Sequence, residues 1–141
     1  MQAVDLYSES VPRETSASLR RAVLVVWIAG FLVGTTTHVL DLVAGLSETY
    51  AAFPKVLRLF WVSLTVLDPI TAALLVLKRR VGIILALLVI SADIAVNWTV
   101  FFTIGGLSLF GVVNQTLFAA ILFTTASTLW RWFPPANRPG I

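Results

Sequence analysis

The sequence predicts an all-α protein: a polytopic membrane four-helix bundle with both termini cytoplasmic. Three observations predict this fold. The 141 residues are 58% hydrophobic and 12% charged, with a mean hydropathy of +0.92. Four apolar segments fill most of the length, and the basic residues flank these segments in an uneven way. Because soluble domains carry about a quarter charged residues, little of the chain is left for a soluble domain.

The expected spans are residues 22–46, 56–77, 81–103 and 107–132. Each is long enough to cross ~30 Å of hydrocarbon at 1.5 Å per residue, and a helix pairs its own backbone groups in lipid. The connections KRR and IGGLS are short, which predicts antiparallel neighbours. We expect polar tails at residues 1–21 and 133–141.

The basic residues predict the orientation. Under the positive-inside rule, the side richer in lysine and arginine is cytoplasmic. With four spans, Lys55 and Arg58 lie on one side, and the other eight basic residues lie on the opposite side: Arg13, Arg20, Arg21, Lys78, Arg79, Arg80, Arg131 and Arg138. Four tryptophans near the expected helix ends fit an aromatic belt: Trp27, Trp61, Trp130 and Trp132.

The first apolar segment has a second interpretation, because Arg20-Arg21 followed by an apolar run also resembles a signal peptide. No A-x-A cleavage site follows, and cleavage would place the remaining spans against the charge bias. An uncleaved span is therefore favoured. Arginine outnumbers lysine, and alanine, valine and leucine dominate, which points to a bacterial source and a cytoplasmic (inner) membrane.

Seven polar residues are predicted inside the spans, where hydrocarbon is expected. At 1.5 Å per residue, most lie roughly 8 to 17 Å below the outer ends of their helices, in the outer half of the membrane. A charge facing lipid costs about 3 kcal/mol, so these side chains are expected to turn inward and enclose one site. We expect the site to open outward or to be closed by the loop at residues 47–54. The seven are His38, Asp41, Asp68, Asp93, Asn97, Asn114 and Gln115.

Helical spacing supports this inward orientation. Residues at i, i+4 and i+7 share one helix face, which groups Gly34 with His38 and Asp41, Trp61 with Thr65 and Asp68, and Asp93 with Asn97. Asn114 and Gln115 point about 100° apart, so at most one of them aims straight into the site. Gly30-x-x-x-Gly34 is interpreted as close helix packing.

The charge balance of this site suggests its chemistry. Three aspartates face one histidine, and no lysine or arginine is expected near them. Three ionised carboxylates could not coexist there, so some must be protonated or neutralised by a cation. The sequence has no cysteine and no zinc-type histidine spacing, and we expect neither a metal nor a cofactor. Nucleic-acid binding is not expected without a soluble platform.

Three stretches, THVLDL, LTVLDPITAALLVLKRR and SADIAVN, resemble the layout of the emopamil-binding or EXPERA type of small membrane domain. This resemblance would cover residues 22–132. It implies a site for sterol-like or cationic amphiphilic molecules and, as in a sterol double-bond isomerase, acid–base groups that handle a proton. By this resemblance the acid–base set is His38, Asp41, Asp68 and Asp93, with Asn97 positioning the ligand. This chain has aspartates where the family uses glutamates.

The leading hypothesis is therefore a site for a sterol-, terpenoid- or quinone-like lipid, with acid–base isomerisation or cyclisation as the candidate chemistry. A proton-coupled transporter of small molecules or cations and a structural or accessory subunit are the alternatives. The expected partners are membrane lipids and a lipophilic small molecule, with a second copy of the chain as a further candidate. The expected ligand-binding residues are Asn97, Asn114, Trp61, Thr65 and Trp98.

Overall fold

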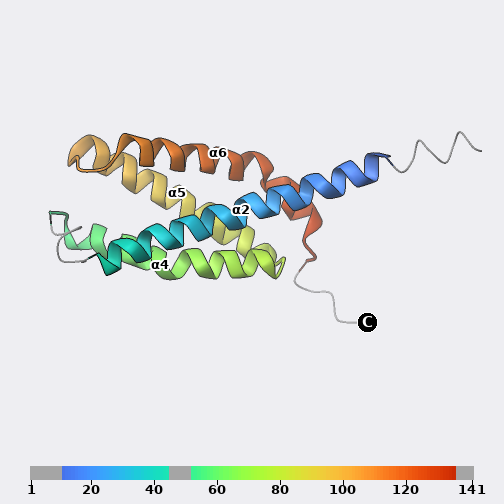
Figure 1. The fold of residues 1–141 in the computed structure, drawn as a ribbon, viewed down its shortest axis with the longest axis horizontal. Coiled ribbons are helices and arrows are strands. Elements are labelled where there is room, and N and C mark those ends of the chain that lie inside the picture. Colours follow the sequence, from blue (N-terminus) through green and yellow to red (C-terminus); the bar gives the residue numbers. More distant parts are fainter. Residues whose placement is uncertain (1–10, 45–51, 136–141) are drawn as a thin grey trace, which may run out of the picture.

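A computed structural model of the chain describes residues 11–44 and 52–135. These residues form an all-helical fold, as predicted. Each helix is long and apolar enough to cross a membrane. In chain order the helices are α2 (Val11–Val43), α4 (Lys55–Val76), α5 (Arg80–Thr103) and α6 (Leu109–Trp132) (Figure 1).

The four helices pack in chain order, each against the next. α2 lies against α4, α4 against α5 and α5 against α6, whereas α2 and α6 touch over the shortest length. Two ends of the bundle can be distinguished (Figure 1). We call residues 17–24, 76–82 and 129–135 the basic end, and residues 41–44, 52–58 and 101–110 the loop end.

The helix bounds agree with the predicted spans except at the chain's beginning. α4, α5 and α6 each begin within two residues of the predicted start. α2 begins at Val11, so residues 11–21 continue the helix where a polar tail was expected. The rest of that tail, residues 1–10, the connection at residues 45–51, and residues 136–141 lie outside the described residues.

The turn between α4 and α5 is built from a helix-capping motif. The backbone N–H of Lys78 donates to the Leu75 carbonyl at 2.9 Å, and that of Arg79 donates to Leu74 at 2.9 Å. This paired pattern places Lys78 in the left-handed region, at φ 51°. Glycine is the usual residue at this position, and a residue with a side chain costs about 1 kcal/mol more there. Within the described residues, Lys78 is the only residue other than glycine with a positive φ.

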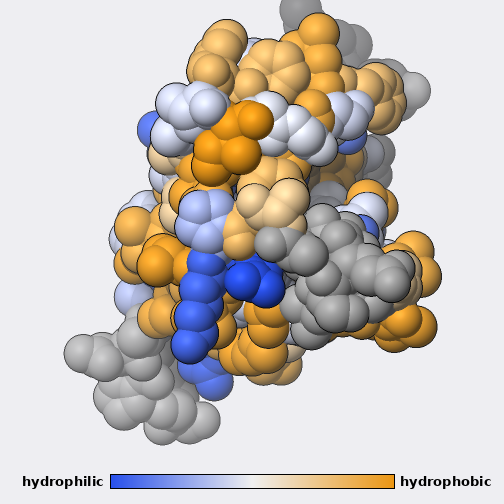
Figure 2. Space-filling model, turned by 90° about the vertical axis from the view of Figure 1, so that its left-hand side faces the viewer, coloured by the Kyte–Doolittle hydropathy of each residue, from blue (hydrophilic) through white to orange (hydrophobic). Residues whose placement is uncertain are grey.

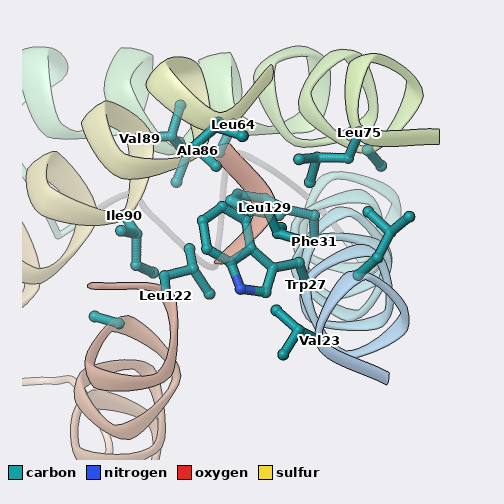
Figure 3. Packing of buried hydrophobic residues seen from close by; sticks show 14 of the residues in the cluster. Val23, Trp27, Phe31, Leu64, Leu75, Ala86, Val89, Ile90, Leu122 and Leu129 are labelled. Atoms are coloured by element: carbon teal, nitrogen blue, oxygen red, sulfur yellow. The ribbon is translucent and has the colours of Figure 1, made fainter. Parts of the chain in front are cut away.

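The largest part of the hydrophobic core surrounds Trp27 of α2. Figure 3 shows the indole ring pointing into the space between the helices, toward Leu122 and Leu129 of α6. Trp27 is fully buried, and its Nε1 donates to Thr125 Oγ1 at 2.9 Å. The helices α2 and α6 are therefore tied together by both packing and a hydrogen bond near the basic end.

Gly30 allows α2 and α6 to approach each other, as the GxxxG spacing predicted. A Cβ atom at this position would collide with the ring of Phe118 on α6. That ring also packs edge-to-face on Phe31, with 5.6 Å between the centroids. Edge-to-face aromatic pairs are worth about 1 kcal/mol beyond their burial.

The tryptophans only partly form the expected belt. Trp130 is 40% exposed and Trp132 is half-buried at the basic end, in agreement with the prediction. Trp27 and Trp61 are buried between the helices, so for them the prediction was wrong.

At the loop end, hydrophilic side chains form a narrow strip among hydrophobic ones (Figure 2).

Candidate functional site

A network of polar side chains joins α4, α5 and α6 inside the bundle. Asn97 is its centre: the Oδ1 atom accepts from Trp61 Nε1 at 2.9 Å. The Asn97 Nδ2 atom donates to Asp93 Oδ1 at 2.9 Å and to Gln115 Oε1 at 2.7 Å. The predicted i, i+4 pair of Asp93 and Asn97 is therefore a direct hydrogen bond. We call Trp61, Asp68, Asp93, Asn97 and Gln115 the carboxyl cluster.

Asp68 belongs to the carboxyl cluster but not to its hydrogen-bond network. Its side chain is only 5% exposed, and that of Asp93 is only 6% exposed. The two carboxyl groups are close enough for the charge of Asp93 to act on Asp68. Within the described residues, no group donates a hydrogen bond to the Asp68 carboxyl group, and its oxygen atoms are not fully enclosed. The predicted convergence of these two acids in one place is thus present in the fold.

Gly34 of α2 gives the Asp68 carboxyl group its space. A Cβ atom at Gly34 would lie 2.6 Å from Asp68 Oδ2 and 3.6 Å from its carboxyl carbon. The carboxyl group therefore rests against the backbone of α2 at a position that any side chain would occupy. The second glycine of the GxxxG pattern consequently serves the polar site, in addition to helix packing.

Among residues 17–44 and 52–135, no basic side chain is placed to compensate the two aspartates. Arg58 on α4 and Lys78 in the α4–α5 turn each lie ten residues from Asp68, or about 15 Å at the rise of a helix. The other basic side chains of residues 17–44 and 52–135 lie at the basic end or in the first turn of α4. Two adjacent carboxylates without a cation need a proton or a positively charged ligand.

His38 and Asp41 lie one and two turns beyond Gly34 on α2, toward the loop end. The His38 ring is half-buried, and its Nδ1 atom is enclosed without a hydrogen-bond partner among the described residues. Asp41 is half-buried and close enough to act on the His38 charge. The two residues form a separate pair on α2, beside the carboxyl cluster.

Three other predicted ligand-binding residues lie outside the carboxyl cluster. Thr65 donates to the Val62 carbonyl of its own helix at 2.7 Å. Trp98 donates through Nε1 to Thr116 on α6 at 2.9 Å. Asn114 is exposed and lines a shallow groove on the outer surface of α6.

Gln115 takes the place that was expected for Asn114. The 100° separation allowed only one of the two to face inward, and the longer side chain does so by reaching Asn97. α6 carries polar or small residues around much of its circumference, so its sequence gave no strong signal for which face is buried. The inward orientation of Gln115 is recognised only from its hydrogen-bond partner on α5, Asn97.

Phe53 covers the carboxyl cluster toward the loop end. Its ring packs edge-to-face on Trp61, with 5.1 Å between the centroids. A Cβ atom at Gly106, in the α5–α6 connection, would lie 3.2 Å from the same ring. Phe53 belongs to the loop at residues 47–54, for which closure of the site stays a prediction, since residues 45–51 lie outside the described part of the chain.

The arrangement allows proton exchange and the binding of a cation or a hydroxyl group. Among residues 11–44 and 52–135, no group of three or more histidine, cysteine, aspartate or glutamate side chains could hold a metal ion. Comparisons with protein-family models, with curated protein sequences and with solved structures found no match to this chain.

Proposed function

We propose that this chain is an integral membrane protein that binds a lipophilic small molecule at Asp68 and Asp93. Asp68 is the observation that carries the proposal. Its side chain is only 5% exposed, its carboxyl oxygens keep a small accessible surface, and among the described residues no group donates a hydrogen bond to them, although a largely buried polar group without a partner is destabilising. An amine or hydroxyl group on a lipophilic molecule would supply this partner.

The chemistry that we propose is acid–base catalysis. Asp68 would give a proton to the ligand or take one from it, while Asp93, held by Asn97, would stabilise the resulting charge. Such steps suit the isomerisation or cyclisation of a sterol-, terpenoid- or quinone-like lipid. His38 and Asp41 would form a second proton-handling pair nearer the loop end. The emopamil-binding or EXPERA type is the family that we propose on this basis.

Orientation and location belong to the same proposal. The basic end would face the cytoplasm of a bacterium, so both termini would be cytoplasmic and the protein would lie in the inner membrane. The carboxyl cluster would then sit in the outer half of the membrane, within reach of lipids of the outer leaflet.

Proton-coupled transport is the second candidate, favoured by the same pair of aspartates. Two buried carboxyl groups without a basic partner can exchange protons for a cation. A purely structural role explains the network of Trp61, Asn97 and Gln115, but it leaves the Asp68 carboxyl group unexplained.

Replacing Asp68 with asparagine tests the proposal. We expect Asp68→Asn to fold normally, since the Asp68 carboxyl group makes no hydrogen bond to another described residue, and to lose ligand binding. The probes are a sterol, a prenylated quinone and a long-chain alkyl amine, each added to the purified protein in detergent. At least one of them should raise the melting temperature of the wild type but not that of Asp68→Asn.

Asn114→Ala is the control, because it alters a polar side chain outside the carboxyl cluster and places no charge on the lipid-facing surface. This variant should respond to the same probe as the wild type. Unchanged binding in both Asp68→Asn and Asp93→Asn would refute the proposal. A proton flux in liposomes that depends on an added cation would favour transport over catalysis.

A further inference from the structure

In residues 17–24, 76–82 and 129–135, which form the basic end, every charged side chain is positive. Within residues 17–44 and 52–135, the three acidic residues are Asp41, Asp68 and Asp93, and none of them lies at this end. Six basic residues do lie there, and they come from α2, from the α4–α5 turn and from α6: Arg20, Arg21, Lys78, Arg79, Arg80 and Arg131. The positive-inside rule accounts for the sign of this charge, but not for its arrangement.

Basic side chains from these segments lie over two indole rings, those of Trp130 and Trp132. Lys78 Nζ lies 4.5 Å from the centroid of Trp132, and the Arg20 guanidinium carbon lies 5.9 Å from the same centroid. Arg80 lies 4.9 Å from the centroid of Trp130 and donates through Nε to the Phe133 carbonyl at 3.0 Å. Arg20 and Lys78, which are distant in sequence, thus lie within 6 Å of the centroid of one ring, and an anion beside them would stabilise their like charges.

Lys78 supplies an independent observation. It occupies the left-handed position of the α4–α5 turn, at φ 51°, where glycine would be less strained. The chain keeps a lysine there, and the turn directs its ammonium group onto Trp132. A strained residue that presents a charged group toward a shared surface indicates a role for that group.

Apolar surface continues directly from these charges. Leu77, next to Lys78, is 65% exposed, and Leu19, next to Arg20, is 60% exposed. Trp130 is also partly exposed beside Arg80. A free anion would use only the charges, whereas a molecule with an anionic head and apolar tails would use both surfaces.

We propose that the basic end binds the headgroup of an anionic phospholipid. Lys78 and Arg80 contact its phosphate, and the acyl chains lie along the exposed side chains of Leu19 and Leu77. Basic clusters at the membrane surface attract anionic lipids, and sites between helices hold particular headgroups. This site is separate from the carboxyl cluster, so the two proposals can fail independently.

Lys78→Gly is the variant that tests this site, because glycine suits the left-handed turn and the variant should melt no lower than the wild type. Melting temperatures are measured in detergent with added phosphatidylglycerol or with phosphatidylcholine of the same acyl chains. We expect phosphatidylglycerol to raise the melting temperature of the wild type more than phosphatidylcholine does. Lys78→Gly should lose at least half of this difference and bind phosphatidylglycerol at least threefold more weakly.

Lys55→Gly is the control, since it removes one positive charge at the loop end and should retain the whole difference. Lys78→Asn, which also tolerates the left-handed turn, should behave like Lys78→Gly. Equal effects of the two lipids on the wild type would overturn the proposal, as would a full phosphatidylglycerol effect in both Lys78 variants. An equal rise with inorganic phosphate alone would also overturn it, because it would show a site for a free anion.

Discussion

Replacing Asn97 with leucine is expected to lower the free energy of unfolding by about 2 kcal/mol, because three hydrogen bonds are lost at ~0.6 kcal/mol each. Asn97 connects Trp61, Asp93 and Gln115 across α4, α5 and α6. Its loss leaves the indole N–H and the Asp93 carboxyl group buried without their shared partner. Reversible unfolding by a denaturing detergent, followed by circular dichroism, measures this change.

Asn114→Leu is the matched control for this experiment. It makes the same chemical change on the neighbouring helix at an exposed side chain, and it should change stability by no more than about 0.5 kcal/mol. Equal losses in the two variants would contradict the network that we describe, because the network assigns the buried role to Asn97 and Gln115.

The two aspartates are expected to respond in opposite ways to leucine. Leucine branches at the same carbon as aspartate, so it fits the space with little change in shape. Asp68→Leu should raise the free energy of unfolding by about 1–3 kcal/mol, because it replaces a largely buried carboxyl group, to which no described residue donates a hydrogen bond, with an apolar group. Asp93→Leu should lower it, since it breaks the hydrogen bond to Asn97.

The comparison of Asp68→Leu with Asp93→Leu shows whether each aspartate stabilises the fold. A residue that destabilises the fold and is nevertheless present is typical of a functional site. The same detergent-unfolding experiment measures both variants. A loss of stability in Asp68→Leu similar to that in Asp93→Leu would mean that Asp68 supports the fold, and the proposed ligand site would lose its main argument.

The sequence predicted the spans well because length and hydropathy determine them almost alone. Asp68, Asp93 and Asn97 were also predictable as neighbours, since buried polar groups in lipid must turn toward each other. The burial of Trp27 was not predicted, because the helix begins at Val11 and this residue lies about four turns inside it. A position near the end of an apolar segment is therefore not a position near the end of a helix.

The sequence could not show how each helix is rotated about its axis or which side chains contact each other. Whether Asn114 or Gln115 faces inward depends on where α5 lies, which single-helix spacing does not reveal. The role of Gly34 was also not predictable, because nothing in the sequence shows that the Asp68 carboxyl group packs against this glycine. The charge cluster at the basic end was predicted as a topology signal, and its convergence on Trp132 required the fold.

A double-mutant cycle on Asp68 and Asp93 tests the central claim, that these two acids share one buried site. The free energies of unfolding are measured for the wild type, Asp68→Asn, Asp93→Asn and the double variant. We predict that the two single effects do not add, because replacing either carboxyl group already removes the repulsion between them. The coupling free energy should be at least about 1 kcal/mol. Additivity within about 0.5 kcal/mol would contradict the account, since it would place the two acids in independent surroundings.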